Sequence, residues 1–354
     1  MLALRKCTCI LLAALFFIVP ANALEEETGA AGKDFIKWID FDVSYQALVD
    51  AMNLDIETYK EEVHLNWIEL LSYLGAKYGG DFSSYREKDL NALAQELKGG
   101  ATMNELTKDM NYYSYYREAY GAVLSGFLGE YQIQVKDEGA PAEPVLETRY
   151  GLKSFSPIAA GFYYQDYDDF GCGRTYGYSR RHLGHDMFGA VGTPIVAVES
   201  GVVEVMGWNQ YGGWRIGIRS LDGRRYHYYA HLRKDRPYHE GLEEGQLVKA
   251  GDVIGYMGRT GYSANENVNN IRQTHLHYGL QLIFDESQKE CNSEIWIDLY
   301  AITRLLERNR SETYRVAETK EFFRVDDFDE EILHQGLNPL EGKHSGNCQE
   351  EELP

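Results

Sequence analysis

The sequence has few cysteines and few positive charges for its length. Five cysteines in 354 residues cannot form the dense disulfide framework of a small secreted scaffold, so the fold must depend on a hydrophobic core. The 35 lysines and arginines are outnumbered by 55 aspartates and glutamates, which gives a formal net charge of -20. Nucleic acid is held by lysine and arginine side chains that neutralise phosphates, so a general nucleic-acid-binding function is excluded.

Long apolar runs are also missing, apart from one near the N-terminus. A basic pair at positions 5 and 6 precedes the apolar run Cys7–Val19 and the small residues Ala21–Ala23. This order is typical of a secretory signal peptide. The alternative is an uncleaved anchor, but the run is shorter than the roughly 20 residues that span a bilayer. We therefore expect residues 1–23 to be removed, and the mature protein to be secreted or extracytoplasmic, without a membrane span.

The residues that follow have helical periodicity, and we expect a small helical domain over residues 24–135. The clearest stripe has apolar residues at i, i+3, i+4 and i+7 and consists of Leu90, Leu93, Ala94 and Leu97. Ser84 with Glu87 and Thr102 with Glu105 both have the spacing of a capping box, which marks a helix start.

Five tyrosines cluster in this region: Tyr112, Tyr113, Tyr115, Tyr116 and Tyr120. Aromatic faces are suited to stacking on sugars, but packing at the core and rim of one amphipathic helix also explains the cluster.

The second part of the chain has a different pattern. Residues 136–149 lose periodicity and contain two prolines, which predicts an interdomain linker. Short β-type runs separated by glycines then fill residues 150–285 and predict a compact antiparallel β domain. Residues 286–325 are expected to form a closing helix and an extension, and residues 326–354 a loose acidic tail. The predicted fold class is therefore α+β, with a helical domain before the β domain.

Seven of the ten histidines lie between positions 182 and 277. His275 and His277 are two residues apart and project from one face of a strand, whereas His182 and Asp186 are four apart in a glycine-containing segment. Two imidazoles and one carboxylate would fill three zinc positions and leave the fourth open, as in a catalytic site. A single His-x-His pair is more often packed or exposed on the surface, so spacing alone leaves both interpretations open.

A series of short motifs resembles one known family. In order along the chain they are Arg180–Phe188, Gly192–Ala197, Gly201–Val203, Gly212–Gly213, Tyr229–Leu232, Gly245–Gly255, Thr260–Gly261 and His275–His277. Together they resemble the lysostaphin-type zinc endopeptidases of bacterial cell walls, over about residues 174–284. The resemblance implies a compact antiparallel β domain with a substrate groove.

The family's site residues can be carried over to matching positions. The resemblance implies that one zinc ion is held by His182, Asp186 and His277. It makes His231 and His275 the catalytic pair beside the zinc-activated water, with acid and base roles unassigned. Tyr176 occupies a position where members can carry a tyrosine facing the oxyanion. Tyr178 competes for that role, and a packing role explains both tyrosines equally well.

Several positions depart from the family pattern or compete with it. The segment Ser263–Gln273 is longer than the usual turn before His-x-His, and Arg219 stands where many members have a further histidine. Cys172 could be a thiolate ligand, although a small packed cysteine is the simpler interpretation. We expect His185 and His227 to point away from the metal or to lie behind its ligands.

The implied function is a secreted endopeptidase that hydrolyses peptide bonds in peptidoglycan, with peptidoglycan peptides as its partners. The alternatives are a non-catalytic member of the same fold that activates other wall hydrolases, or a wall-binding module in residues 35–131. Residues 150–285 contain 14 bases and 14 acids, so we expect a groove without charge bias. The bond cut, the partner of the helical domain and the oligomeric state are left open.

Overall fold

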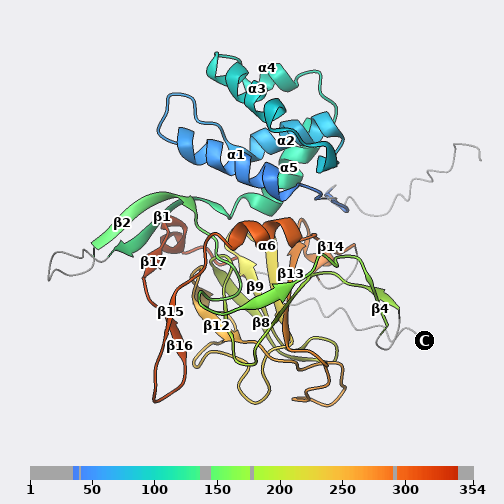
Figure 1. Ribbon diagram of the computed structural model, residues 1–354, viewed down its shortest axis with the longest axis vertical. Helices are drawn as coiled ribbons and strands as arrows, with labels where there is room; N and C mark the ends of the chain where they lie inside the picture. Colours follow the sequence, from blue (N-terminus) through green and yellow to red (C-terminus); the bar gives the residue numbers. More distant parts are fainter. Residues whose placement is uncertain (1–34, 40, 136–144, 176–178, 290–292, 342–354) are drawn as a thin grey trace, which may run out of the picture. The chain divides into compact units, whose positions relative to one another are not determined.

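Helices form the first third of the described chain and antiparallel strands form most of the rest. The computed structural model describes residues 35–39, 41–135, 145–175, 179–289 and 293–341, so the predicted signal peptide over residues 1–23 lies outside the described residues. The helices shown in Figure 1 are α1 (Tyr45–Thr58), α2 (Trp67–Tyr78), α3 (Glu87–Lys98), α4 (Met103–Thr107), α5 (Tyr113–Leu124) and α6 (Tyr300–Leu306). Within these described ranges, no helix is both long and apolar enough to cross a membrane.

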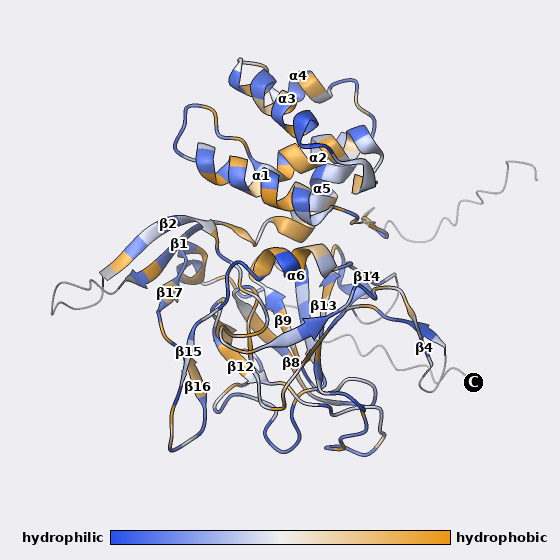
Figure 2. Cartoon of the chain, in the orientation of Figure 1, coloured by the Kyte–Doolittle hydropathy of each residue, from blue (hydrophilic) through white to orange (hydrophobic). Residues whose placement is uncertain are grey.

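Local sequence signals account for most helix boundaries. The stripe of α3 is buried as predicted, and Thr102 and Glu105 form the predicted capping box of α4. The capping box predicted at Ser84 is wrong: this residue ends the 3-10 helix η1 (Phe82–Ser84), and Arg86 precedes α3 without a side-chain cap. Figure 2 shows hydrophobic and hydrophilic residues alternating along α1 and α3, the amphipathic pattern that buries one face of each helix.

The tyrosine cluster packs against the helical core at its inner end. Tyr120 is fully buried, and its ring meets Phe41 edge-on with the centroids 5.3 Å apart. Tyr116 lies beside it at 5.4 Å, whereas Tyr112 is 73% exposed. Packing therefore explains Tyr116 and Tyr120.

The strands predicted after residue 150 form a large antiparallel sheet. Its main path has the order β11-β8-β9-β10-β13-β6-β3, and β14 also pairs with β13. The strands are β3 (Tyr164–Asp166), β6 (His185–Gly189), β8 (Gly201–Asn209), β9 (Gly213–Ser220), β10 (Arg225–Ala230), β11 (Leu247–Val248), β13 (His275–Leu282) and β14 (Ile295–Trp296). The hairpin predicted at Asp222-Gly223 joins β9 to β10, with Gly223 at φ 76°.

Smaller strand pairs complete the β region. These are β12 (Val253–Tyr256) with β7 (Pro194–Val196), β15 (Thr313–Arg315) with β16 (Phe322–Arg324), and β4 (Gly173–Arg174) with β5 (Arg180–Arg181). The predicted closing helix is α6, which buries Ile302, Leu305 and Leu306. One hydrophobic core runs from the helices into the sheet, so the described residues from Ile36 onward belong to one compact unit.

Two predicted boundaries are wrong because strands extend into them. Strand β1 (Leu128–Val135) lies inside the expected helical domain, and β2 (Val145–Leu152) includes residues 145–149 of the expected linker. The two strands pair antiparallel along their whole length, with Leu128 opposite Leu152. The prolines that suggested a linker fall between the paired strands, in residues 136–144 outside the described chain.

The expectation of a loose acidic tail from residue 326 is also wrong at its start. Strand β17 (Phe328–Asp329) pairs with β1, and the 3-10 helix η3 (Glu331–Gln335) follows it. Phe328 is fully buried and its ring contacts Phe155 and Tyr131. One aromatic anchor therefore holds a segment whose average composition indicates disorder.

A buried ion-pair network joins the last helical turn of α5 to the sheet. Arg225 makes two hydrogen bonds to the carboxylate of Glu199, at 2.8 and 2.9 Å, and donates a third to the carbonyl oxygen of Ala122 at 2.8 Å. His227 lies 3.0 Å from the same carboxylate. Burial raises the pKa of Glu199, but the charge of Arg225 and the hydrogen bonds from His227 and Arg225 outweigh burial and hold it well below the ordinary value.

This network predicts a pH-dependent stability for Glu199→Gln. The variant removes one of the two carboxylates that pair with the buried Arg225 and leaves only the more exposed Asp222, so the free energy of unfolding at pH 7 should fall by about 3 kcal/mol. Because the folded pKa of Glu199 is depressed, its contribution is complete above the ordinary glutamate pKa and is lost as the pH falls below it. Urea unfolding of both proteins at pH 7 and pH 4 should therefore show a smaller difference at pH 4.

Glu147→Gln is the matched control, since Glu147 pairs with Arg149 and both side chains are about half exposed. It should leave the unfolding midpoint unchanged. A Glu199→Gln protein as stable as wild type at pH 7 would contradict the assignment.

Candidate metal centre and groove

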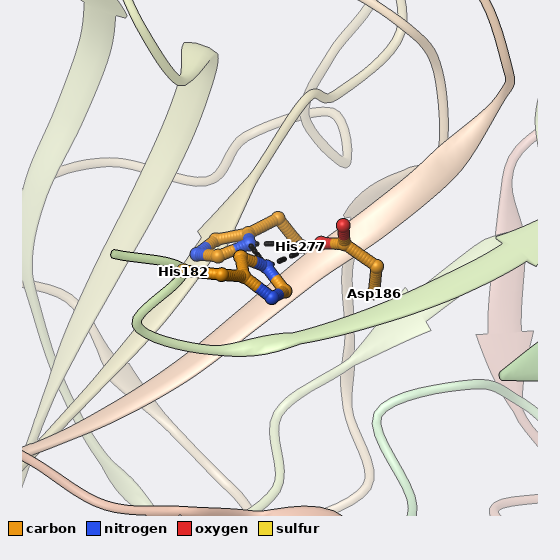
Figure 3. A group of neighbouring side chains, drawn as sticks. All are labelled: His182, Asp186 and His277. Carbon is orange, nitrogen blue, oxygen red and sulfur yellow. Dashed lines mark hydrogen bonds and ion pairs between the residues drawn. The ribbon is translucent and has the colours of Figure 1, made fainter. Parts of the chain in front are cut away.

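Strand pairing brings two of the predicted metal ligands face to face. In the antiparallel register of β6 and β13, Asp186 lies directly opposite His277, and His182 lies three residues before the start of β6. His182 Nε2 is 3.0 Å from Asp186 Oδ1 and 3.1 Å from His277 Nδ1, and His277 Nδ1 is 2.9 Å from Asp186 Oδ1. Figure 3 shows the three side chains turned toward one another.

These three donor atoms fit a tetrahedral metal site. Zinc bonds of about 2.0–2.1 Å to nitrogen and oxygen place neighbouring ligand atoms about 3.3 Å apart in a tetrahedron. The donor separations of 2.9–3.1 Å are close to that spacing. All three residues also line an open groove, so a metal held here would keep a position for a further ligand. Among the described residues, this is the one group of histidine and acidic side chains with metal-ligand geometry.

Residues behind the ligands fix their orientation. His182 Nδ1 hydrogen-bonds to the carbonyl oxygen of Asp169 at 3.3 Å and lies 3.0 Å from its Oδ1, which directs Nε2 toward the other donors. Arg174 contacts both Asp169 and Asp186, and its Nη2 is 3.3 Å from Asp186 Oδ2. The arginine thus engages one carboxylate oxygen of Asp186 and leaves Oδ1 to the cluster. Sequence reasoning missed Asp169 and Arg174, because no motif spacing connects them with His182.

The ionisation of the cluster follows from its hydrogen bonds. Burial raises the pKa of Asp186, but hydrogen bonds from His182 and His277 outweigh it and hold the carboxyl well below its ordinary value. Burial lowers the pKa of His277, whereas for His182 the hydrogen bond and charge of Asp186 overcome burial and raise it. Asp186 is therefore a permanent carboxylate at neutral pH.

Gly184 is needed for the close approach of His277. A Cβ atom at this position would lie 2.5 Å from His277 Cε1 and 2.8 Å from the carbonyl oxygen of Tyr278. Backbone atoms cannot move aside as a flexible side chain can. Any larger residue here would push the imidazole away from the other two donors.

The two predicted catalytic histidines border the same cluster. His275 Nε2 lies 3.6 Å from Asp186 Oδ1, and the ring centroids of His231 and His275 are 4.8 Å apart. His275 Nδ1 is 2.9 Å from the carbonyl oxygen of Gln273. A carbonyl oxygen only accepts, so Nδ1 carries the proton and Nε2 has the free lone pair that faces the cluster.

His231 is held in the same tautomer by two carbonyl groups. Its Nδ1 lies 3.1 Å from Gly212 O and 3.0 Å from Thr260 O. Burial lowers the pKa of His231 well below its ordinary value, and the neighbouring His275 and His277 act in the same direction. His231 is therefore a neutral imidazole whose Nε2 can accept a proton.

Glycines explain how those carbonyls reach His231. A Cβ on Gly213, which has φ 66°, would lie 2.4 Å from the carbonyl carbon of Thr260, and one on Gly212 would lie 2.3 Å from the hydroxyl of Tyr228. His231 itself has φ 62°, a conformation that a non-glycine residue adopts only when its surroundings impose it. The Gly-Gly and Thr-Gly motifs thus serve to orient His231.

The groove is more basic than the sequence predicted. Its volume is about 880 Å³, and its ionisable lining outside the histidines comprises Arg174, Arg180, Arg181, Arg215, Arg272, Asp186 and Glu294. The expectation of a groove without charge bias is therefore wrong, because arginines from several segments line the groove while most acids of residues 150–285 lie elsewhere. Arg180 donates to the hydroxyl of Tyr262 at 3.0 Å and lies over the rings of Tyr211 and Tyr262.

The longer segment before His-x-His forms part of this groove. Asn270, Ile271, Arg272 and Gln273 all line it. Asn267 fixes the segment, because its Oδ1 accepts hydrogen bonds from the indole of Trp214 and the backbone of Asp235, both at 2.9 Å. The extra residues are thus an ordered wall of the groove.

The competing candidates lie away from the donors. Cys172 is exposed, so the packed interpretation is wrong, and it is not part of the metal-ligand group. His185 contacts Asp166 and Thr303, and His227 contacts Glu199 and Tyr278, so both point away from the cluster as expected.

Two further candidates have different outcomes. Arg219 is fully buried and paired with Glu204 and Glu286. Tyr176 and Tyr178, the candidates for an oxyanion contact, lie outside the described residues.

The fold and the site together define an antiparallel β domain with an open groove and a group of side chains that could hold a metal ion. Residues 180–290 match the model of the family described as peptidase family M23. The L-Ala–D-Glu endopeptidase of Bacillus subtilis is 40% identical over 124 residues, which are 35% of this chain and 36% of that protein. Lysostaphin of Staphylococcus simulans is 39% identical over 98 residues, which are 27% of this chain and 17% of lysostaphin. Residues 180–290 are therefore a peptidase M23 domain of the lysostaphin type.

A structural match extends beyond the M23 domain. The structure of a Ruminococcus gnavus protein assigned as a glycyl-glycine endopeptidase covers 77% of this chain and 91% of its own length, with a TM-score of 0.52. At 21% identity this likeness concerns the fold alone. It confirms the predicted architecture of a helical region followed by an antiparallel β domain. The chain spans about a third or less of the curated relatives above.

The close approach at Gly184 generates a prediction about metal binding. Gly184→Ala should weaken binding of a divalent metal by roughly 10- to 100-fold, as displaced ligand supports do in other metal sites. Gly173→Ala is the control, because a Cβ there meets no atom within 4 Å. Competitive titration of both variants against a zinc indicator measures the difference. Equal affinities would show that His277 does not depend on this contact.

Proposed function

We propose that this chain is a zinc-dependent endopeptidase that hydrolyses peptide bonds in bacterial peptidoglycan, outside the cytoplasmic membrane. The observation that carries the proposal is the convergence of His182, Asp186, His277, His231 and His275 at one groove. The relatives support the substrate class, since the Bacillus subtilis protein is named for an L-Ala–D-Glu bond and lysostaphin belongs to the same family. The pattern of residues 1–23 supports secretion.

One zinc ion would be held by His182 Nε2, Asp186 Oδ1 and His277 Nδ1. When bound, zinc supplies a Lewis acid that polarises the scissile carbonyl and lowers the pKa of a water molecule. The chain itself supplies the fixed negative charge of Asp186 and the orientation of both imidazoles, through Asp169, Arg174 and the space left by Gly184.

His231 and His275 would handle the protons. Each has Nδ1 held by a backbone carbonyl, so each presents Nε2 to the reaction. A neutral imidazole removes the proton from the attacking water, and the protonated form of the other can stabilise the developing oxyanion or protonate the leaving amine. The near-equivalent settings of the two histidines leave the order of their roles unassigned.

The geometry favours an enzyme over a non-catalytic scaffold. Two imidazoles with a fixed tautomer beside the cluster, and a positive φ at His231, are the arrangement that proton transfer requires, and they support an enzyme. Gly213 and Gly261 allow the close backbone approach that brings the two carbonyl groups to His231. His231 is thereby oriented for proton transfer.

Digestion of purified peptidoglycan tests the function. The full-length mature protein with zinc should release soluble peptides, identified by mass spectrometry, and a chelator should abolish the release until zinc is restored. If the same fragments appear in equal amounts in the presence of the chelator, the metallopeptidase proposal is wrong. A zinc-loaded protein that cleaves nothing would instead favour the non-catalytic alternative.

Two substitutions separate the metal ligands from the proton-transfer groups. His277→Ala should lose both bound zinc and activity, because it removes a ligand. His231→Ala should keep about one zinc ion per chain and lose at least 100-fold in kcat, the usual scale for a general acid or base. Zinc content by inductively coupled plasma mass spectrometry and turnover of a released-peptide assay provide the two readouts.

His334→Ala is the matched control, because His334 lies on η3, is largely exposed and pairs with Asp329. It should retain zinc and full activity. Full activity in His231→Ala would overturn the catalytic assignment without affecting the zinc assignment.

A further inference from the structure

A second hollow lies outside the catalytic groove and has no lining residue in common with it. Its volume is about 390 Å³. Three segments form it: the turn at Val191–Gly192 before β7, the loop Arg233–Arg236 after β10, and the β15–β16 hairpin with Phe322. We call it the basic hollow.

The basic hollow concentrates positive charge on a strongly acidic chain. Its ionisable lining has five cations and one acid: Arg233, Lys234, Arg236, Arg315, Lys320 and Asp235. The carboxylate of Asp235 is already engaged, since it accepts a hydrogen bond from Asn267 Nδ2 at 2.7 Å. An excess of this size on a chain of net charge -20 does not follow from average composition.

Two of the cations are held rigidly by the fold. Arg233 lies over the ring of Tyr256, with its guanidinium carbon 4.5 Å from the ring centroid, and its Nε donates to Arg236 O at 3.0 Å. Arg236 in turn bonds to the carbonyl oxygen of Thr319 and to the buried carboxylate of Glu321. The loop is thereby tied to the β15–β16 hairpin, and the shape of the hollow is fixed.

The remaining cations have no counter-charge in the described chain. Among the described residues, no carboxylate forms an ion pair with Lys234, Arg315 or Lys320, and all three side chains are exposed. Burial lowers the pKa of Arg233, and the nearby charge of Arg236 acts in the same direction. Like charges that line one hollow repel one another, and a bound anion relieves that repulsion.

We propose that the basic hollow is a binding site for an oxyanion of the phosphate class. A monocarboxylate neutralises one of the unpaired cations, whereas a phosphate group offers several oxygens and up to two charges to the same cluster. Guanidinium groups bind phosphate through paired hydrogen bonds, and lysines add point charges. Two sources share this chemistry, a free phosphate ion and a phosphodiester polymer. The proposal does not rest on the peptidase activity.

The test uses calorimetric titration of the full-length mature protein with inorganic phosphate, with poly(glycerol phosphate) and with acetate at equal ionic strength. Phosphate and the polymer should bind, and acetate should bind at least tenfold more weakly. The Lys234→Ala/Lys320→Ala double variant should weaken phosphate binding at least tenfold, as expected when two charge-assisted contacts are lost. Lys88→Ala, an exposed lysine on α3 outside the hollow, should bind like wild type.

Further titrations distinguish the basic hollow from the metal site and identify the kind of ligand. Because a bound catalytic metal can also bind phosphate, the titration is repeated in His277→Ala, in which binding should persist. Tighter binding of the polymer per phosphate group identifies a polymer ligand, and equal binding identifies a free anion. Unchanged phosphate binding in the double variant, or equal binding of acetate, would overturn the proposal. If the double variant has a lower melting temperature, Arg315→Gln replaces it as a single exposed change and should give a measurable loss of binding.

Discussion

The antiparallel pairing of β6 with β13 is the constraint on which the site depends. It sets Asp186 opposite His277, and the pairing of β13 with β10 sets Ala230 opposite the same histidine, so His231 follows at the strand end. Side chains alternate across a strand, so His185 and Tyr278 point to the other face. A slip of one residue would turn Asp186 away from His277 and send His185 into the groove. The placement of Asp186 beside His277 is thus set by strand register.

The sequence predicts the parts of this arrangement that are local. Alternation along His275–His277 places both rings on one face, and helical stripes such as that of α3 are buried as their periodicity predicts. Register, in contrast, is set by contacts distant in sequence, and the proximity of His182 to His277 came only through the family resemblance. The predicted boundaries of the helical domain and the linker were wrong for the same reason. Strand β1 finds its partners after residue 144 and again at Phe328, and composition averages hide both.

The glycine motifs show how a sequence pattern acquires a physical meaning only in three dimensions. Read along the chain, Gly212-Gly213 and Thr260-Gly261 are turn signals of no particular function. In the fold they are points where two backbones approach too closely for a side chain, and that approach delivers the Gly212 and Thr260 carbonyls to His231 Nδ1. The tautomer of a buried histidine is therefore determined by residues 19 and 29 positions away.

Charge behaves in the same way. The formal charges of residues 150–285 sum to zero, yet the arginines and the acids of this segment lie in different surroundings. Several acids are used internally: Glu199 pairs with Arg225, and Glu204 pairs with the fully buried Arg219. The arginines that line the groove and the basic hollow then have few acidic neighbours. At physiological salt the Debye length is about 8 Å, so the acidic flanks do not cancel the positive charge of these arginines. A chain that repels polyanions at a distance can thus still present two concave basic surfaces at contact range.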